Sequence, residues 1–243
     1  MKAAAIVFAF SLSTAGAAFA GSPAPAPAPT PAPTPPAPAA HDWTGFYAGG
    51  TVGYASAEST HCDGPGCGSF GLGPLPKPEP DGAMAGLTVG YNFQPSANLV
   101  WGFEADYSFG DLSETVPSTA VFGCGGGCRT EISGFGSIRA RLGTPVGNRG
   151  ALLPYVTAGA AFTDIEADLV GAGAGPGDST ETSAVAGLGL EYAAGPNWSV
   201  KLEYLHVFDT DSFVHDPTAC AAPGCGVKDV NMDVVRIGAN FHF

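Results

Sequence analysis

Residues 99–109 read LVWGFEADYSF, and every second side chain in this stretch is apolar. Trp101 and Phe109 belong to the apolar set, whereas Glu104 and Asp106 lie between its members. Because successive side chains of a β-strand point to opposite faces, the stretch predicts a strand with one apolar and one polar face. It is long enough to cross a membrane as a tilted strand, which needs about 9–11 residues.

The same alternation recurs along the rest of the chain. The further stretches are 46–54, 85–93, 132–142, 154–162, 184–192, 198–208 and 233–243. Their connections alternate between short ones (95–98, 145–149 and 194–197) and long ones (about 58–81, 110–131, 164–181 and 209–229). A soluble β-sandwich has no reason for this strict alternation. We therefore predict an all-β fold, an eight-stranded antiparallel up-and-down transmembrane β-barrel with short periplasmic turns and long external loops.

The polar faces of these strands carry as many acidic as basic side chains. They are Glu104, Asp106, Glu191 and Glu203 against Arg139, Arg141, Lys201 and Arg236. The interior of an eight-stranded barrel is just wide enough to be filled by side chains, and buried charges need partners. We therefore expect a neutral salt-bridge network in the lumen. The apolar faces carry no charge except Asp233, at the outer end of the last stretch.

Charge is scarce and one-sided in this chain. Charged residues make up 13% of the sequence, against about 25% in soluble domains, and the net charge is −13. This excludes a basic nucleic-acid-binding surface of the usual kind. Most acidic residues lie in the long connections, where they form either a solvated surface or a specific site. The specific hypothesis uses Asp164, Glu166 and Asp168, whose side chains continue the lipid-facing set of 154–162 and would share divalent cations with lipopolysaccharide phosphates.

The first residues are typical of an exported protein. Residues 1–20 begin with Lys2, continue without charge and end in a small-x-small cleavage site at Ala18–Ala20, which predicts a signal peptide rather than a membrane anchor. Residues 21–41 are rich in Ala and Pro and predict an extended periplasmic linker, with a ligand for a proline-binding module as the alternative. The barrel is then expected over 42–243.

Several sequence motifs carry a family resemblance. They are WTGFYAGGTVGY (43–54), WGFEADYSF (101–109), GSIRARLG (136–143), LPYVTAGAAF (153–162), GLGLEY (187–192), NWSVKLEYLHV (197–207) and VVRIGANFHF (234–243). In order and spacing the chain resembles the small outer-membrane β-barrel surface antigens of alpha-proteobacteria, also called porin-family or OmpA-like barrels. The resemblance implies the bacterial outer membrane, outer-membrane lipids and lipopolysaccharide as surroundings, and insertion by the barrel-assembly machinery. The terminal Phe241 and Phe243 would be the assembly signal.

The six cysteines form three local pairs in the predicted external loops: Cys62 and Cys67, Cys124 and Cys128, and Cys220 and Cys225. An even number of locally paired cysteines in an exported chain predicts disulfides, each stapling the tip of a loop. A metal site is the alternative, because His61 adjoins the first pair and His215 precedes the third. The spacing is a weak metal pattern, so we expect no metal and no cofactor.

Three functions remain open at this point. The first is a structural, surface-exposed barrel with acidic, disulfide-stapled loops, whose external ligand is unidentified. The second is a narrow diffusion channel for small solutes, with a water path along lumen glycines at positions 49, 53, 90, 102, 159, 187, 189 and 238. The third is a lipid-modifying enzyme that uses His206 with the nearby Asp209. It lacks a nucleophile, so we expect no catalytic residues.

Overall fold

A computed structural model describes residues 40–63, 75–118, 126–170, 177–208, 213–215 and 225–243. In chain order, the strands are β1 (Gly45–Asp63), β2 (Asp81–Ser96), β3 (Leu99–Val116), β4 (Cys128–Gly143), β5 (Leu152–Leu169), β6 (Gly177–Ala193), β7 (Trp198–Val207), β8 (Phe213–His215) and β9 (Cys225–His242). One short 3-10 helix, η1 (Asn148–Gly150), lies between β4 and β5. In this part of the chain we find no helix with the length and hydropathy to cross a membrane.

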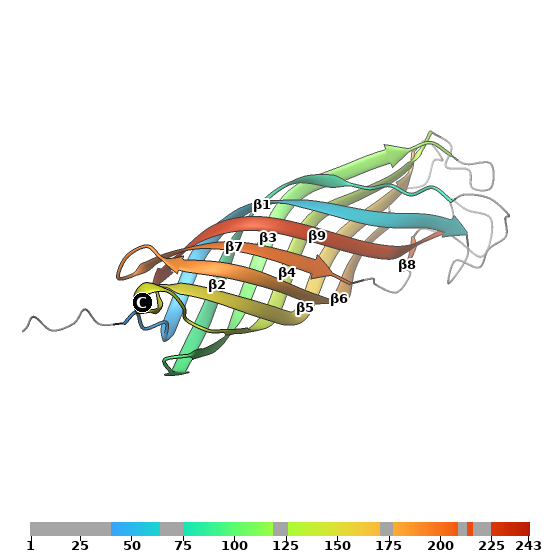
Figure 1. Ribbon diagram of the computed structural model, residues 1–243. Helices are drawn as coiled ribbons and strands as arrows, with labels where there is room; N and C mark the ends of the chain where they lie inside the picture. Colours follow the sequence, from blue (N-terminus) through green and yellow to red (C-terminus); the bar gives the residue numbers. More distant parts are fainter. Residues whose placement is uncertain (1–39, 64–74, 119–125, 171–176, 209–212, 216–224) are drawn as a thin grey trace, which may run out of the picture. The chain divides into compact units, whose positions relative to one another are not determined.

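The sheet closes on itself. Strands β1 to β7 pair in sequence order, β7 pairs with β9, and β9 pairs with β1, all antiparallel. The three-residue β8 pairs only with the first residues of β9 and is not one of the closing strands. The prediction of an eight-stranded antiparallel barrel is therefore confirmed, with β1–β7 and β9 as the wall (Figure 1).

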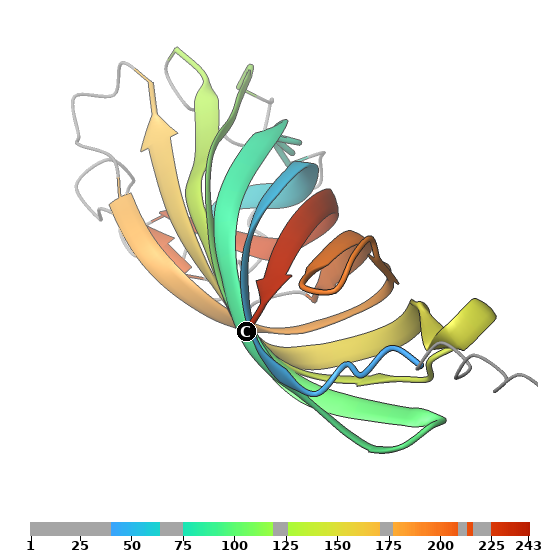
Figure 2. The ribbon, with the colours of Figure 1, turned by 90° about the vertical axis from the view of Figure 1, so that its left-hand side faces the viewer.

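All short connections lie at one end of the barrel, which we call the short-turn end. They join β2 to β3, β4 to β5 and β6 to β7, and the chain terminus at Phe243 lies at the same end. Figure 2 shows the barrel with this end toward the viewer. The strand ends that the long connections join lie at the opposite end of the barrel.

The two faces of the wall follow the predicted alternation. Leu87 is 71% exposed and Phe109 is 66% exposed on the outer face, whereas Arg139 inside is 1% exposed. Large apolar side chains on the outside of a barrel are stable only in contact with lipid or a comparable apolar medium. The low charge content of the sequence is thus explained by an apolar outer belt.

The strands extend further than the sequence pattern indicated, and here the predicted loop boundaries were wrong. Residues of the predicted connections 58–81, 110–131, 164–181 and 209–229 belong in part to β1–β6 and β9. β5 has 18 residues, nearly twice what a membrane crossing needs. Beyond the belt the pattern inverts, because Ile165 and Ala167 point inward and are buried while Glu166 points outward and is exposed.

The inverted segments lie at the end of the barrel opposite the short-turn end, and they give that end its own apolar interior. The buried cluster comprises Ala55, Ala57, Met84, Leu112, Ile132, Phe135, Ala161, Ile165, Ala167, Val185, Leu205, Val207, Val227, Val230, Met232 and Val234. A wall with a polar outside and an apolar inside is the arrangement of a water-soluble barrel. We call this part the projection, because it extends the barrel beyond its apolar belt.

Candidate functional site

A charged cluster fills the interior at the level of the apolar belt, with Arg139 of β4 at its centre. The Arg139 guanidinium donates to Glu104 Oε1 at 2.7 Å, to Asp106 Oδ2 at 2.8 Å and to Glu203 Oε1 at 3.0 Å. These three carboxylates come from β3 and β7, which lie on different sides of β4. One guanidinium thus ties separate parts of the wall together across the lumen.

The structure brings all eight charged residues expected in the lumen into this cluster. Arg236 pairs with Asp106 at 2.7 Å and with Glu203 at 2.7 Å. Lys201 Nζ lies 2.8 Å from Glu104 Oε2, and Arg141 lies 2.6 Å from Glu191. Buried charges are tolerated only when paired and hydrogen-bonded. Equal numbers of acids and bases make the cluster neutral.

Two tyrosines belong to the cluster, and the sequence analysis did not single them out. The Tyr47 hydroxyl donates to Glu104 Oε2 at 2.8 Å, and the Tyr155 hydroxyl donates to Glu203 Oε1 at 3.0 Å. The Arg141 guanidinium lies 4.0 Å from the centre of the Tyr155 ring, within the range of a cation–π interaction. The sequence did contain a signal for both tyrosines. Each alternates with the lipid-facing side chains of its strand, which places it on the lumen face.

The lumen glycines accommodate neighbouring atoms. A Cβ atom on Gly90 would lie 2.3 Å from Tyr47 Cζ, and one on Gly189 would lie 2.3 Å from Tyr155 Cζ. At Gly49, Gly53, Gly102, Gly159 and Gly187 a Cβ atom would lie between 2.0 and 2.5 Å from backbone oxygens of the adjacent strand, and at Gly238 it would lie 3.0 Å from Thr51 Cγ2. At these positions atoms of neighbouring residues occupy the space that a side chain would need.

The short-turn end of the lumen is covered by residues 40–44, which we call the N-terminal segment. Trp43 is 0% exposed, and its Nε1 donates to the carbonyl of Gly150 at 2.9 Å. Its backbone N–H donates to Gln94 Oε1 at 2.9 Å. Trp43 therefore lies inside the barrel mouth and does not face the lipid.

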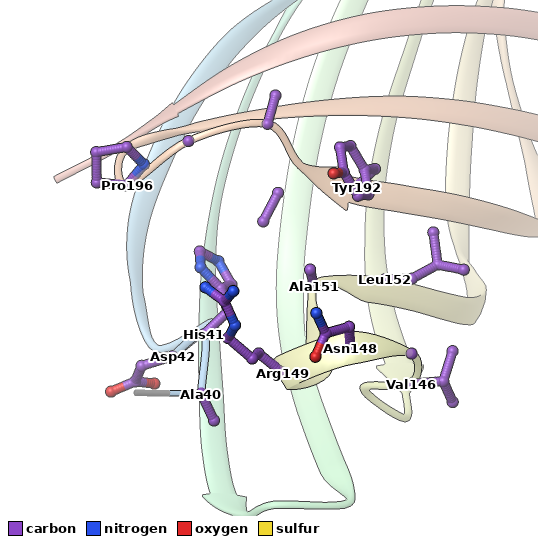
Figure 3. Close-up of a pocket in the computed structure, with 14 residues that line it drawn as sticks. Ala40, His41, Asp42, Val146, Asn148, Arg149, Ala151, Leu152, Tyr192 and Pro196 are labelled. Carbon is purple, nitrogen blue, oxygen red and sulfur yellow. The ribbon is translucent and has the colours of Figure 1, made fainter. Parts of the chain in front are cut away.

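His41 packs beside this tryptophan. Its backbone N–H donates to the carbonyl of Arg149 at 2.8 Å, and its ring lies 4.6 Å from the Trp43 ring. Burial at the mouth, reinforced by the nearby His242, lowers the pKa of His41 from its usual value. Figure 3 shows His41 between the turn that contains Arg149 and the turn that contains Pro196.

The outward-facing acids of the projection do not converge on one ion. Asp164 accepts hydrogen bonds from the Tyr107 hydroxyl at 2.8 Å and from Thr180 Oγ1 at 2.8 Å. Glu166 and Asp168 line a separate small cavity of about 170 Å³ with Arg129 and Glu131. Among the residues that the structure describes, no group of three or more His, Cys, Asp or Glu side chains is placed to hold a metal ion.

His206 also faces outward, with a partner that sequence reasoning missed. Its Nδ1 lies 2.7 Å from Asp233 Oδ1, to which the Tyr204 hydroxyl donates at 2.6 Å. Asp209, which the sequence had suggested, lies outside the described residues. The position opposite His206 on β6 is Ala186, so no nucleophile stands there. The cross-strand register between β7 and β9 is what brings Asp233 to His206.

The structure describes half of the cysteines. Cys128 is buried at the start of β4 and is disulfide-bonded. Cys62 and Cys225 lie near the ends of β1 and β9. Cys67, Cys124 and Cys220 lie outside the described residues, so the three pairings stay predictions. His61, the suggested metal ligand, is buried with Nε2 2.8 Å from Thr130 Oγ1.

The C-terminal residues pack where the first and last strands of the barrel meet. The backbone N–H of Phe243 donates to the carbonyl of Phe46 at 3.0 Å, and the Phe241 ring lies 5.2 Å from the Trp198 ring. Phe241 and Phe243 have their ring centres 5.3 Å apart. Their role as an assembly signal remains a proposal.

Comparison with known proteins agrees with this architecture. The model of the outer membrane protein beta-barrel domain matches residues 11–243. The 31 kDa outer-membrane immunogenic proteins of Brucella melitensis and Brucella suis are each 29% identical over 222 residues, covering 83% of this chain and 84% of theirs. The crystal structure of the outer membrane protein OprG from Pseudomonas aeruginosa has a TM-score of 0.57 at 17% identity, covering 84% of this chain and 99% of OprG. The OprG likeness concerns the fold alone.

Proposed function

The chain belongs to the outer membrane protein beta-barrel family, and we propose that it is a structural, surface-exposed protein whose closed barrel carries an acidic projection outside the cell. Its location is the bacterial outer membrane. In such barrels short turns face the periplasm and long connections face the exterior. We therefore refer to the short-turn end as the periplasmic end and to the projection as external.

One observation carries the proposal that the barrel is closed: the neutral cluster around Arg139. Its side chains come from β3, β4, β6, β7 and β9 and cross the lumen, and Arg139 and Glu203 have side chains that are 0% exposed. An ion entering this space would have to break several desolvated ion pairs, each of which leaves an unpaired buried charge. Above the cluster, the apolar interior of the projection adds a second barrier to polar solutes.

The projection supports the proposed display role. Its outer face carries a row of acidic side chains, which are Glu58, Asp81, Asp111, Glu131, Glu166, Asp168, Asp178 and Asp229. Such a surface stays hydrated and resists aggregation. We further propose that the three cysteine pairs staple the loop tips above it, and that acids near the belt contact lipopolysaccharide through divalent cations.

A narrow diffusion channel is the alternative function. It shares the fold, the location and the family, so the two functions differ only in whether the lumen passes solutes. The contacts of Tyr47 with Gly90 and of Tyr155 with Gly189 favour the closed barrel. We propose no lipid-modifying activity, because Ala186 stands where a nucleophile opposite His206 would be needed.

Two measurements test the proposal. An epitope inserted after Pro117 is expected to bind antibody on intact cells, whereas one inserted between Gly195 and Pro196 is expected to bind only after permeabilisation. Liposomes that contain the protein are expected to swell in small sugars no faster than empty liposomes. Labelling in the reverse order contradicts the orientation, and fast swelling contradicts the closed lumen.

A further inference from the structure

A cavity of about 790 Å³ lies at the periplasmic mouth. The N-terminal segment, the turn between β4 and β5 and the turn between β6 and β7 form its walls. Figure 3 shows its lining, which is polar on one side, with His41, Asp42, Asn148 and Arg149, and apolar on the other, with Leu152 and Tyr192. The Asp42 carboxylate accepts the backbone N–H of Thr44 at 2.9 Å. Leu152 and Tyr192 are opposite each other in the register of β5 and β6, on the lipid-facing side of the wall.

A second cavity, of about 730 Å³, is a groove on the lipid-facing wall. It runs over β6, β7, β9 and β1, and its sides are Leu190, Val200, Leu202 and Ile237. Its floor is low because Gly50 and Ala239 are adjacent in register and both are small. Leu152 and Tyr192 line this groove as well as the mouth cavity, so the two spaces adjoin.

The combined shape is polar at the periplasmic edge and apolar toward the centre of the bilayer. We propose that it binds one glycerophospholipid of the periplasmic leaflet, with the phosphate against Arg149 and an acyl chain in the groove. A guanidinium suits phosphate because its N–H groups match two phosphate oxygens. An acyl chain in the groove is favourable because it covers apolar surface with hydrocarbon. The polarity order along the site is that of a phospholipid in this leaflet.

Hydrogen bonds hold the backbone of the turn that carries Arg149. Arg149 has a φ of 59°, in the left-handed region that arginine rarely adopts. Its carbonyl accepts the His41 N–H at 2.8 Å, and the next residue, Gly150, accepts the Trp43 indole N–H at 2.9 Å. Within the described residues no carboxylate forms an ion pair with Arg149, so its charge is available to a ligand.

The test uses the full-length barrel, purified in detergent, delipidated and analysed by native mass spectrometry with defined lipids. The probes are phosphatidylethanolamine and phosphatidylglycerol, which share the phosphate, and diacylglycerol, which lacks it. We expect one tightly retained copy of either phospholipid and none of diacylglycerol. Arg149→Asn removes the charge while keeping a residue that tolerates the left-handed region, and it is expected to weaken retention at least about tenfold.

Matched controls separate this site from general lipid contact. Arg129→Asn removes a guanidinium from the external end and is expected to leave retention unchanged. Gly50→Leu places a leucine on the groove floor, where the nearest atom to its Cβ would be 3.8 Å away, and it is expected to reduce retention. Ala105→Leu places a leucine side chain on the outer wall away from the groove and is expected to have no effect. Folding of every variant is checked by its heat-modifiable gel mobility.

Three results overturn the proposal. They are equal retention in Arg149→Asn and Arg129→Asn, equal retention in Gly50→Leu and Ala105→Leu, and binding of diacylglycerol as tight as that of the phospholipids. None of these measurements depends on whether the lumen conducts, so the outcome is separate from that of the proposed function.

Discussion

Tyr47 of β1 and Gly90 of β2 are opposite each other in the barrel wall, and the tyrosine ring occupies the space that a side chain at position 90 would need. The same relationship joins Tyr155 of β5 and Gly189 of β6. In both pairs the glycine lets the ring lie along the wall and reach a carboxylate of the central cluster. Gly90 and Gly189 therefore serve the packing of aromatic rings in the lumen.

This relationship predicts the effect of a single methyl group. Gly90→Ala is expected to displace the Tyr47 ring from Glu104 and to lower the free energy of unfolding by about 1–3 kcal/mol, as overpacking does in closed cores. Gly50→Ala is the control, because its methyl group would lie at an ordinary van der Waals distance of 3.8 Å from the Gly86 carbonyl oxygen, and its effect is expected within about 0.5 kcal/mol. Denaturant titration in lipid vesicles measures both. Equal stability of the two variants would show that the Tyr47 contact is unimportant.

Removal of Arg139 is expected to have a larger effect. Arg139→Ala leaves Glu104, Asp106 and Glu203 with too few basic partners in a buried space, and breaking such a pair costs about 3–5 kcal/mol. Arg129→Ala, which removes a half-exposed ion pair with Glu131, is expected to cost less than about 1 kcal/mol. The comparison is made by the same titration, and a loss in Arg139→Ala as small as that in Arg129→Ala is incompatible with a desolvated cluster.

Trp43 tests the closure of the periplasmic mouth. Trp43→Ala removes a fully buried indole and its hydrogen bond to Gly150, and it is expected to lower the free energy of unfolding by about 3–5 kcal/mol. Trp198→Ala removes a tryptophan that is 54% exposed on the lipid face and is expected to have a smaller effect. If the order of the two variants were reversed, Trp43 would belong to the membrane interface after all.

The packing of His41 is expected to depend on pH. Its folded-state pKa lies below the unfolded value of 6.5, because burial and His242 disfavour the imidazolium more than Asp42 and Glu191 favour it. The contribution of neutral His41 to the free energy of unfolding is therefore complete above about pH 6.5, and it is lost as the pH falls through the folded-state pKa of His41. The fluorescence of Trp43, in a variant with Trp101→Phe and Trp198→Phe, is expected to shift to longer wavelength as the pH falls from about 7.5 to about 5.

His41→Gln is the control for that titration. It removes the titrating group at the same place and is expected to abolish the pH dependence of the Trp43 emission. A shift of equal size in His41→Gln would assign the effect to another group.

The proposed disulfides predict a simple chemical result. In protein purified from the outer membrane, the 6 cysteines are expected to react with an alkylating agent only after reduction. Peptide mapping of the oxidised protein is expected to link Cys62 with Cys67, Cys124 with Cys128, and Cys220 with Cys225. Alkylation without reduction would refute the stapled loops.

The period of two was enough to predict the barrel from the sequence. In 99–109 it places Trp101 outside and Glu104 inside, and the same rule, applied to every strand, gathers the lumen charges. It placed Asp164 and Glu166 on the outer face of the projection correctly, but it did not reveal that β5 continues there, with Ile165 inside. There the outer face of the wall meets water in place of lipid, so the outer side chains are polar and the inner ones are apolar. In the sequence such a strand resembles a polar loop.

Contacts between distant segments were beyond the sequence pattern. Trp43 precedes the first strand, and its place in the mouth depends on hydrogen bonds to Gln94 of β2 and to Gly150 of the turn between β4 and β5. The partnership of His206 with Asp233 depends on the register of β7 with β9. A period indicates which face a side chain occupies, but it carries no information on which residue of another strand lies beside it.

The central claim is that the lumen is closed, and the most direct test is the conductance of single barrels in a planar lipid bilayer. With the charged cluster around Arg139 intact, we predict no steady steps above the current of a protein-free bilayer at about 1 M salt, where screening favours ion entry. Reproducible, long-lived conductance steps from the wild-type protein would contradict the account and identify the chain as a narrow channel.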